Sequence, residues 1–144
     1  LTITNGFLFA DPDVGDNEVK VTITSTYGEI GLSNYEGAVC AGCGSTSVTL
    51  TGTLTVINAA FSQELTYTVD EDWNGSDNIT ITFSDQGYTG SRCAAGTCES
   101  GERSDLCILT ASTQVSVTVQ AVNDAPTIVA DGTSPEANTG VPTK

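Results

Sequence analysis

The sequence predicts an all-β fold, a seven-stranded antiparallel β-sandwich with one short helix and two loop insertions that contain cysteines. Two observations lead to this prediction. Apolar and polar residues alternate with a period of two in several short segments, and turn residues separate these segments. A chain of 144 residues with 38% hydrophobic residues and a mean hydropathy near zero is also long enough for one hydrophobic core.

Seven segments carry the strand pattern. The first strand region joins residues 1–4 to the apolar residues 7–9. Threonine fills most outward positions, where a β-branched polar residue suits a solvated sheet face. Along the chain, the other six strands are predicted at residues 19–24, 29–32, 47–50, 65–69, 79–83 and 115–119.

One stretch departs from the alternation. Leu54, Ile57 and Phe61 recur at helical spacing, and either Thr51 or Thr53 can cap the start of a helix. The spacing therefore predicts one short helix over residues 54–61. Two Gly- and Cys-rich segments, 34–46 and 86–107, are predicted to be the loop insertions.

The chain is strongly acidic, with 18 acidic residues, four basic residues, no histidine and a net charge of −14. Such a chain has no basic surface to displace counterions, which excludes nucleic-acid partners, and it disfavours anionic membranes. No apolar run approaches the roughly 20 residues that span a bilayer, so no membrane insertion is predicted. Divalent cations would relieve the self-repulsion, and calcium takes the most oxygen ligands. Calcium is the predicted cofactor, and simple solubility is the alternative.

The cysteines indicate an oxidising compartment. Loop cysteines in an acidic, Thr-rich β-protein favour disulfides, so an extracellular or cell-surface location is predicted. A zinc site built from the Cys-x-x-Cys pair and later cysteines, and free thiols, are the alternatives. The sequence does not fix the pairing, and the odd cysteine is either free or a bridge between copies. The five candidates are Cys40, Cys43, Cys93, Cys98 and Cys107.

Acidic and amide residues cluster in loops at predicted strand ends. Segment 11–17 is the densest cluster, residues 70–72 follow a strand directly, and Asn123-Asp124 precede Pro126. Oxygen side chains in turns made by Pro and Gly can point at one calcium ion, although Asp and Asn in turns also serve only their own backbone. The calcium-ligand candidates are Asp11, Asp13, Asp16, Asn17, Asp70, Glu71, Asp85, Asn123, Asp124 and Glu136.

The end of the chain reads on into its beginning. Residues 119–128 run from a strand into an Asn-Asp-Ala-Pro break, and Lys144 continues into the strand-like Leu1-Thr-Ile-Thr without a seam. We therefore predict one unit of a tandem array. Residues 1–125 form the β-sandwich repeat, and residues 126–144 form the linker and the first strand of the next repeat. Separate chains that exchanged this strand would instead polymerise by strand donation.

These motifs resemble the cadherin-like repeats of large bacterial surface and secreted proteins, and more distantly animal cadherin domains. The resemblance implies an immunoglobulin/cadherin-like sandwich with calcium at the junctions between consecutive domains. The two Cys-containing loops depart from it. The matching segments are Asp11-Pro-Asp-Val-Gly-Asp-Asn17, residues 50–60, Leu65-Thr-Tyr67, Asp72-Trp-Asn-Gly-Ser-Asp77, Ser84-Asp-Gln-Gly87 and Val122-Asn-Asp-Ala-Pro126.

The resemblance also implies roles for single residues. Asp11, Asp13 and Asn17 correspond to an aspartate-x-aspartate loop with its following asparagine, and Asp85 to a lone aspartate between later strands. Asp70 with Glu71 corresponds to an acidic pair after a middle strand, and Asn123 with Asp124 to the linker ligands. Glu136 corresponds to a glutamate early in a domain's first strand.

The sequence thus predicts a structural repeat of an extracellular filament or adhesin stalk, stiffened by calcium and joined head-to-tail to copies of itself. The alternatives are a glycan- or receptor-binding adhesion module at the cell surface and a subunit of a strand-donated fibre. Enzymatic activity is not predicted, because no histidine is present and the carboxylates are spread over strand ends. Asn74 and Asn78 begin N-glycosylation sequons, so glycosylation is a further prediction.

Overall fold

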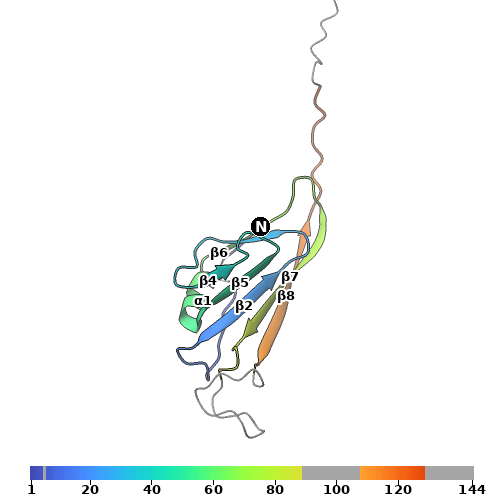
Figure 1. Cartoon of the computed structure of the whole chain (residues 1–144). Coiled ribbons are helices and arrows are strands. Elements are labelled where there is room, and N and C mark those ends of the chain that lie inside the picture. Colours follow the sequence, from blue (N-terminus) through green and yellow to red (C-terminus); the bar gives the residue numbers. More distant parts are fainter. Residues whose placement is uncertain (5, 89–107, 129–144) are drawn as a thin grey trace, which may run out of the picture.

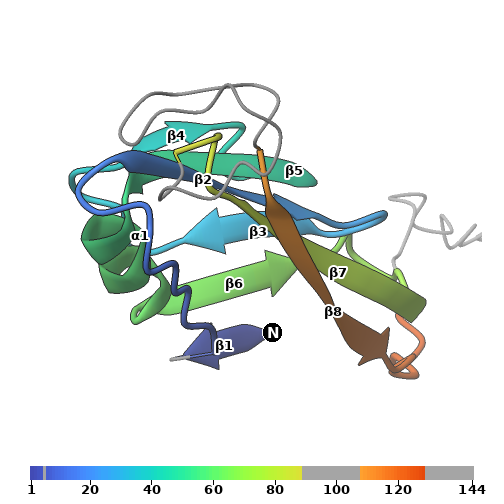
Figure 2. The same cartoon turned by 90° about the horizontal axis from the view of Figure 1, so that it is seen from below.

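The computed structural model describes residues 1–4, 6–88 and 108–128, and it confirms the all-β sandwich. Two antiparallel sheets lie face to face, as Figure 1 and Figure 2 show from two directions. The smaller sheet has the order β1 (Thr2–Thr4), β6 (Glu64–Thr68), β3 (Glu29–Leu32). The larger sheet has the order β4 (Val39–Ala41), β5 (Ser47–Thr53), β2 (Glu18–Thr24), β7 (Gly75–Ser84), β8 (Thr110–Val119).

The period-two alternation places one face of each strand in the core. β2 is the central strand of the larger sheet, and its Val19, Val21 and Ile23 are fully buried. The register pairs Val21 with Leu50 of β5 on one side and with Phe83 of β7 on the other. Aligned apolar residues on neighbouring strands form a continuous apolar layer, which packs against the smaller sheet.

The predicted helix forms as α1 (Leu54–Phe61). Thr53 is the N-cap, and its hydroxyl accepts a hydrogen bond from the Val56 backbone N–H at 3.5 Å, which selects between the two predicted caps. Ile57, Ala60 and Phe61 are buried, so α1 covers one side of the core as the chain passes from β5 to β6 (Figure 2). Within the described ranges, no helix is long and apolar enough to cross a membrane.

The prediction of a strand at residues 7–9 is wrong. The backbone of Phe9 is held by the side chain of Asn58 in α1, which accepts from the Phe9 N–H and donates to the Phe9 carbonyl, both at 2.9 Å. The Phe9 and Phe61 rings meet edge to face at 4.9 Å. An amide side chain therefore takes the place of a strand partner, and the apolar sequence reflects docking against the helix.

The predicted loop insertion at residues 34–46 is partly sheet. β4 forms inside it and pairs with β5, with Cys40 opposite Leu50, so the described residues contain eight strands where seven were predicted. Cys40 and Cys43 form a disulfide, which confirms the prediction for this pair. Both thiols are used, so the zinc alternative for this pair is wrong. Cys93, Cys98 and Cys107 lie outside the described residues, as does the second insertion from residue 89 onward.

The chain leaves the sandwich after β8. Residues 120–128 have no regular secondary structure, and all of them are exposed. Figure 1 shows this segment running away from the two sheets at the end where β8 finishes. Residues 126–128, the described part of the predicted linker, therefore lie outside the sandwich core.

Candidate functional site

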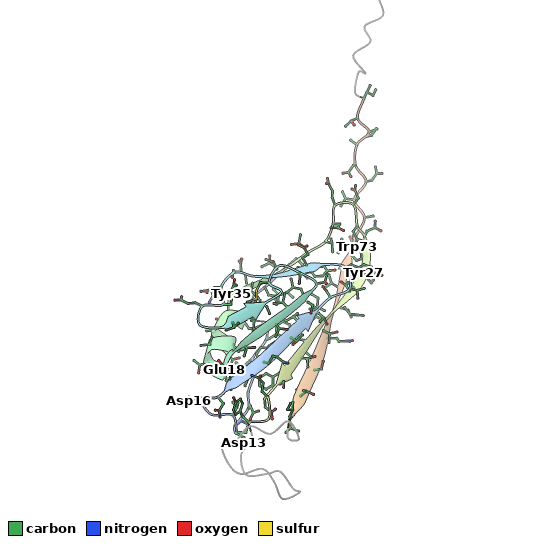
Figure 3. All side chains as sticks on the ribbon, in the orientation of Figure 1. Asp13, Asp16, Glu18, Tyr27, Tyr35 and Trp73 are labelled. Carbon is green, nitrogen blue, oxygen red and sulfur yellow. A yellow bond between two sulfur atoms is a disulfide. The ribbon has the colours of Figure 1, made fainter. Side chains whose placement is uncertain are left out.

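The predicted ligands lie in two groups at opposite ends of the sandwich. Figure 3 shows Asp13 and Asp16 at the end where β2 begins, and Trp73 at the other end, where β8 leads into residues 120–128. We call the first the acidic end, defined by loop 11–17 and Asp85, and the second the linker end, defined by turn 70–74 and residues 120–124. Head-to-tail copies would bring unlike ends together.

Loop 11–17 at the acidic end is held in shape from within. Val14 is fully buried, and its carbonyl accepts hydrogen bonds from the backbone N–H of Asn17 at 3.1 Å and from the Asn17 side-chain amide at 3.0 Å. Asp11 accepts from the Asp13 N–H at 2.9 Å, which is an Asx turn. With Val14 pointing inward, Asp13 and Asp16 are left exposed to solvent.

Asp85 lies beside this loop but is buried. It follows the end of β7, and the neighbouring Gln86 donates its side-chain N–H to the Glu18 carbonyl at 3.1 Å. The Asp85 carboxylate oxygen Oδ1 accepts from the backbone N–H groups of Gly87 and Leu109, both at 2.8 Å. Asp85 therefore holds the turn after β7 against the start of β8, which is a structural role. Its role as a calcium ligand stays a prediction.

At the linker end, turn 70–74 faces the departing chain. Asp72 has a left-handed backbone with φ of 64°, and the Trp73 N–H donates to the Asp70 carbonyl at 3.2 Å. Asp72 and Asp124 line the same hollow of about 330 Å³, together with Trp73 and Asn74. Asp70, Glu71 and Asn123 are exposed at this end and do not line the hollow. The carboxylate that shares a hollow with Asp124 is thus Asp72, one position beyond the predicted pair.

An aromatic pair that the sequence did not reveal lies beside this hollow. Trp73 packs against Tyr27 in the β2–β3 turn in a tilted arrangement, with ring centroids 5.0 Å apart and an interplanar angle of 33° (Figure 3). Tyr27 is exposed and Trp73 is half-buried. The linker end therefore carries both carboxylates and an accessible aromatic surface.

The described residues gather no group of three Asp, Glu, Cys or His side chains that could hold a metal within one copy. The acidic end offers exposed carboxylates from one loop, and the linker end offers Asp72 and Asp124. Glu136 lies outside the described residues. Oxygen donors of this kind suit calcium chemically, but calcium takes six to eight of them, so neither end is complete alone. Calcium binding stays a prediction.

The two sequons lie on the surface. Asn74 is exposed in the turn before β7, and its amide donates to the Asp72 carbonyl at 3.3 Å. Asn78 is exposed on β7, where its side-chain oxygen accepts from the Ser116 hydroxyl at 2.8 Å. Both asparagines are accessible, and glycosylation of either remains a prediction.

The most elaborate polar site is one that sequence reasoning missed. Asp77 on β7 is 4% exposed and accepts hydrogen bonds from four groups. The Thr26 and Tyr27 N–H groups of the β2–β3 turn donate at 3.0–3.2 Å, the Asn78 N–H at 2.7 Å, and the Tyr67 hydroxyl of β6 at 2.8 Å. Because β6 and β7 belong to different sheets, Asp77 ties the two sheets and a turn together.

A sequence signal for Asp77 existed. It stands on the inward phase of the β7 alternation, two residues before the buried Ile79 and four before Ile81. A charged residue at an apolar position is almost never fully buried unless it is paired. An aspartate at this inward position of β7 therefore indicates a carboxylate that is buried with hydrogen-bond partners.

Protonation of this pair is strongly perturbed. Burial raises the pKa of Asp77, but the hydrogen bonds from Tyr27, Tyr67, Thr26 and Asn78 outweigh burial and hold the pKa well below its usual range. Burial, reinforced by the hydrogen bond to Asp77 and by its negative charge, raises the pKa of Tyr67 to about 12. The folded state therefore favours the Asp77 carboxylate and the Tyr67 hydroxyl.

Stability is expected to fall at both pH extremes through this pair. The pKa of Asp77 is lower in the folded state than in the unfolded state, where it is about 4. The Asp77 carboxylate therefore stabilises the fold above about pH 4, and this stabilisation is lost as the pH falls from there toward the pKa of the folded state. The raised Tyr67 pKa contributes stability below about pH 10, and this is lost as the pH rises toward 12. Urea unfolding over a pH series measures both losses. Tyr67→Phe should remove the alkaline loss, whereas Tyr35→Phe at an exposed site should retain it. An unchanged alkaline loss in Tyr67→Phe would contradict the assignment.

A comparison of the chain with protein-family models, curated protein sequences and solved structures finds no significant match in any of the three. The resemblance to cadherin-like repeats accordingly rests on the sequence motifs of this chain.

Proposed function

We propose that the chain is a structural repeat of an extracellular filament or adhesin stalk, stiffened by calcium at the junction between consecutive copies. The observation that supports this proposal is that carboxylate and amide side chains lie at both ends of one elongated sandwich and that the chain leaves from one of these ends. Ligands confined to one end could serve a single copy, whereas ligands at two opposite ends suit a junction.

The donor set at such a junction has the chemistry that calcium requires. Asp13 and Asp16 of one copy would face Asp72, Asn123 and Asp124 of the copy before it. All of these are oxygen ligands, and calcium prefers such ligands in flexible arrangements. The net charge of −14 makes the approach of two copies unfavourable until cations neutralise the junction. Extracellular calcium modules bind at about 10⁻⁴–10⁻³ M, which suits this location.

The linker and the rigid ends support the mechanical part of the proposal. Residues 120–126 lead directly out of β8 as an exposed segment without regular secondary structure, which suits a joint between copies. Loop 11–17 is anchored by the buried Val14, and turn 70–74 is held by the contact of Trp73 with Tyr27. Calcium between two such rigid ends would lock the joint and turn a flexible chain into a rod.

A comparison of one copy with two copies joined end to end tests the proposal. With calcium about a hundredfold above Kd, mass action should stabilise the two-copy chain by about 2.7 kcal/mol relative to EDTA, and small-angle scattering should show elongation. The single copy is measured at a concentration at which sedimentation shows it to be monomeric, and its melting temperature should not respond there, because each end alone is incomplete. An equal response in one copy and two copies would contradict the junction.

Variants placed in one copy at a time define the polarity. In the two-copy chain, Asp13→Asn in the second copy or Asp124→Asn in the first copy should weaken the calcium response, and the reciprocal placements should not. Glu64→Gln, an exposed carboxylate on β6, is the matched control and should retain the response. Absence of any response would contradict the calcium proposal. It would favour the glycan- or receptor-binding module, for which the exposed Tyr27–Trp73 pair is the supporting observation.

A further inference from the structure

The sandwich is open along one side. β1 and β8 are edge strands of the two sheets and lie on the same side of the sandwich (Figure 2). Residues of both strands line a groove of about 900 Å³. Its walls include Ile3 and Phe7 on one side and Val115, Val117 and Val119 on the other. A second hollow of about 530 Å³ also borders Gly6 and Phe7 and reaches residues 111–113 of β8. The groove and this second hollow together therefore border both halves of β8.

The groove has the features of a strand acceptor. Among the described residues, β8 pairs with β7 alone and β1 pairs with β6 alone, so each has one free edge of backbone N–H and C=O groups. Val115 and Val119 are half-buried, and their inward faces line the groove. An added strand would satisfy the backbone groups and cover these apolar side chains, which is how extended peptides bind to sheet edges.

We infer that residues 127–144 of a second copy fill this groove as an added β-strand. The described part of the linker runs away from its own sandwich, and Ile128 is 99% exposed. Filling the groove of its own copy would require the chain to reverse direction. Filling the groove of the next copy requires only that it continue. This inference goes beyond the calcium junction and does not rest on it, because it uses backbone pairing and apolar contacts.

The donor segment has the length and composition that the groove requires. Residues 127–134 precede Pro135 and would span about 26 Å as a strand, against about 33 Å for the ten residues of β8. Thr127-Ile128-Val129-Ala130 is uncharged and rich in β-branched residues. Residues 127–144 contain only Asp131, Glu136 and Lys144 as charged residues, so the segment can approach an acidic chain without strong repulsion.

Sedimentation velocity of the full chain in EDTA, from micromolar to millimolar concentration, tests the inference. The native chain is expected to form linear assemblies that grow with concentration. Ile128→Asp in the donor segment should weaken association at least tenfold. Val39→Asp is the matched control, because Val39 is exposed on β4, at the edge of the larger sheet opposite β8 and outside both the groove and the donor segment, and it should associate like the native chain.

Mixing two altered chains makes the test specific. Val115→Asp, with an altered groove and an intact donor, and Ile128→Asp, with an intact groove and an altered donor, should each stay monomeric and combine only as one-to-one dimers. A synthetic peptide of residues 127–144 should cap the native assemblies, which tests the same groove should Val115→Asp fail to fold. A monomeric native chain would overturn the inference. If Ile128→Asp then also lowered the melting temperature, the segment would fill its own groove.

Discussion

Asp77→Ala is expected to lower the free energy of unfolding by about 3–5 kcal/mol, because it leaves the donors around a buried carboxylate without an acceptor. Three of these donors, the Thr26 N–H, the Tyr27 N–H and the Tyr67 hydroxyl, come from other elements of the sandwich. The loss should loosen the β2–β3 turn and the contact between the two sheets together. Domains of this size are stable by only about 5–15 kcal/mol, so much of the total would be lost.

Chemical denaturation of matched variants measures the effect. Asp77→Asn retains one acceptor oxygen but places an NH₂ group among donors, so a cost of about 1–3 kcal/mol is expected. Asp16→Ala removes a solvent-exposed carboxylate and should stay within about 0.5 kcal/mol of the native chain. A cost for Asp77→Ala no larger than for Asp16→Ala would show that the buried network contributes nothing.

Phe61→Ala is expected to cost about 3–5 kcal/mol, the usual range for loss of a buried phenylalanine. Phe61 is 2% exposed at the end of α1, and its ring meets Phe7 at 6.1 Å and Phe9 at 4.9 Å, both edge to face. Phe9 in turn stacks on Phe83 of β7 at 5.5 Å. The cavity left by alanine would thus remove the contacts of α1 with Phe7 and Phe9, and with them the link through Phe9 to the larger sheet.

Leu8→Ala is the control for this variant. Leu8 lies between Phe7 and Phe9 in sequence but is 84% exposed, so its replacement should change stability by no more than about 0.5 kcal/mol. Phe61→Leu retains most of the buried volume and should cost less than Phe61→Ala. Thermal and urea unfolding measure all three. Equal costs for Leu8→Ala and Phe61→Ala would mean that segment 6–10 is not anchored through the ring cluster.

Several elements of this fold could be predicted from local sequence patterns, and one could not. Alternation over 19–24 and 79–83 predicted β2 and β7, because the side-chain period of a strand is local and is written in the order of the residues. Helical spacing and a threonine cap predicted α1 for the same reason. The apolar run Phe7-Leu8-Phe9 led to a wrong strand prediction, because the Phe9 backbone is hydrogen-bonded to the Asn58 side chain, 49 residues away in the sequence.

For the candidate site, the sequence by itself determined the chemical groups, namely many carboxylate and amide oxygens and a net charge of −14 that favours cations. Only the tertiary structure decided where those groups lie. Topology sends the loop before β2 to one end and the turn before β7 to the other, and it places Asp72 beside Asp124. The tertiary structure also brings Asp77 to the β2–β3 turn, where its carboxylate accepts hydrogen bonds from Thr26 and Tyr27, 51 and 50 residues earlier in the chain. Local patterns fix which elements form, whereas contacts between distant residues depend on how the two sheets pack.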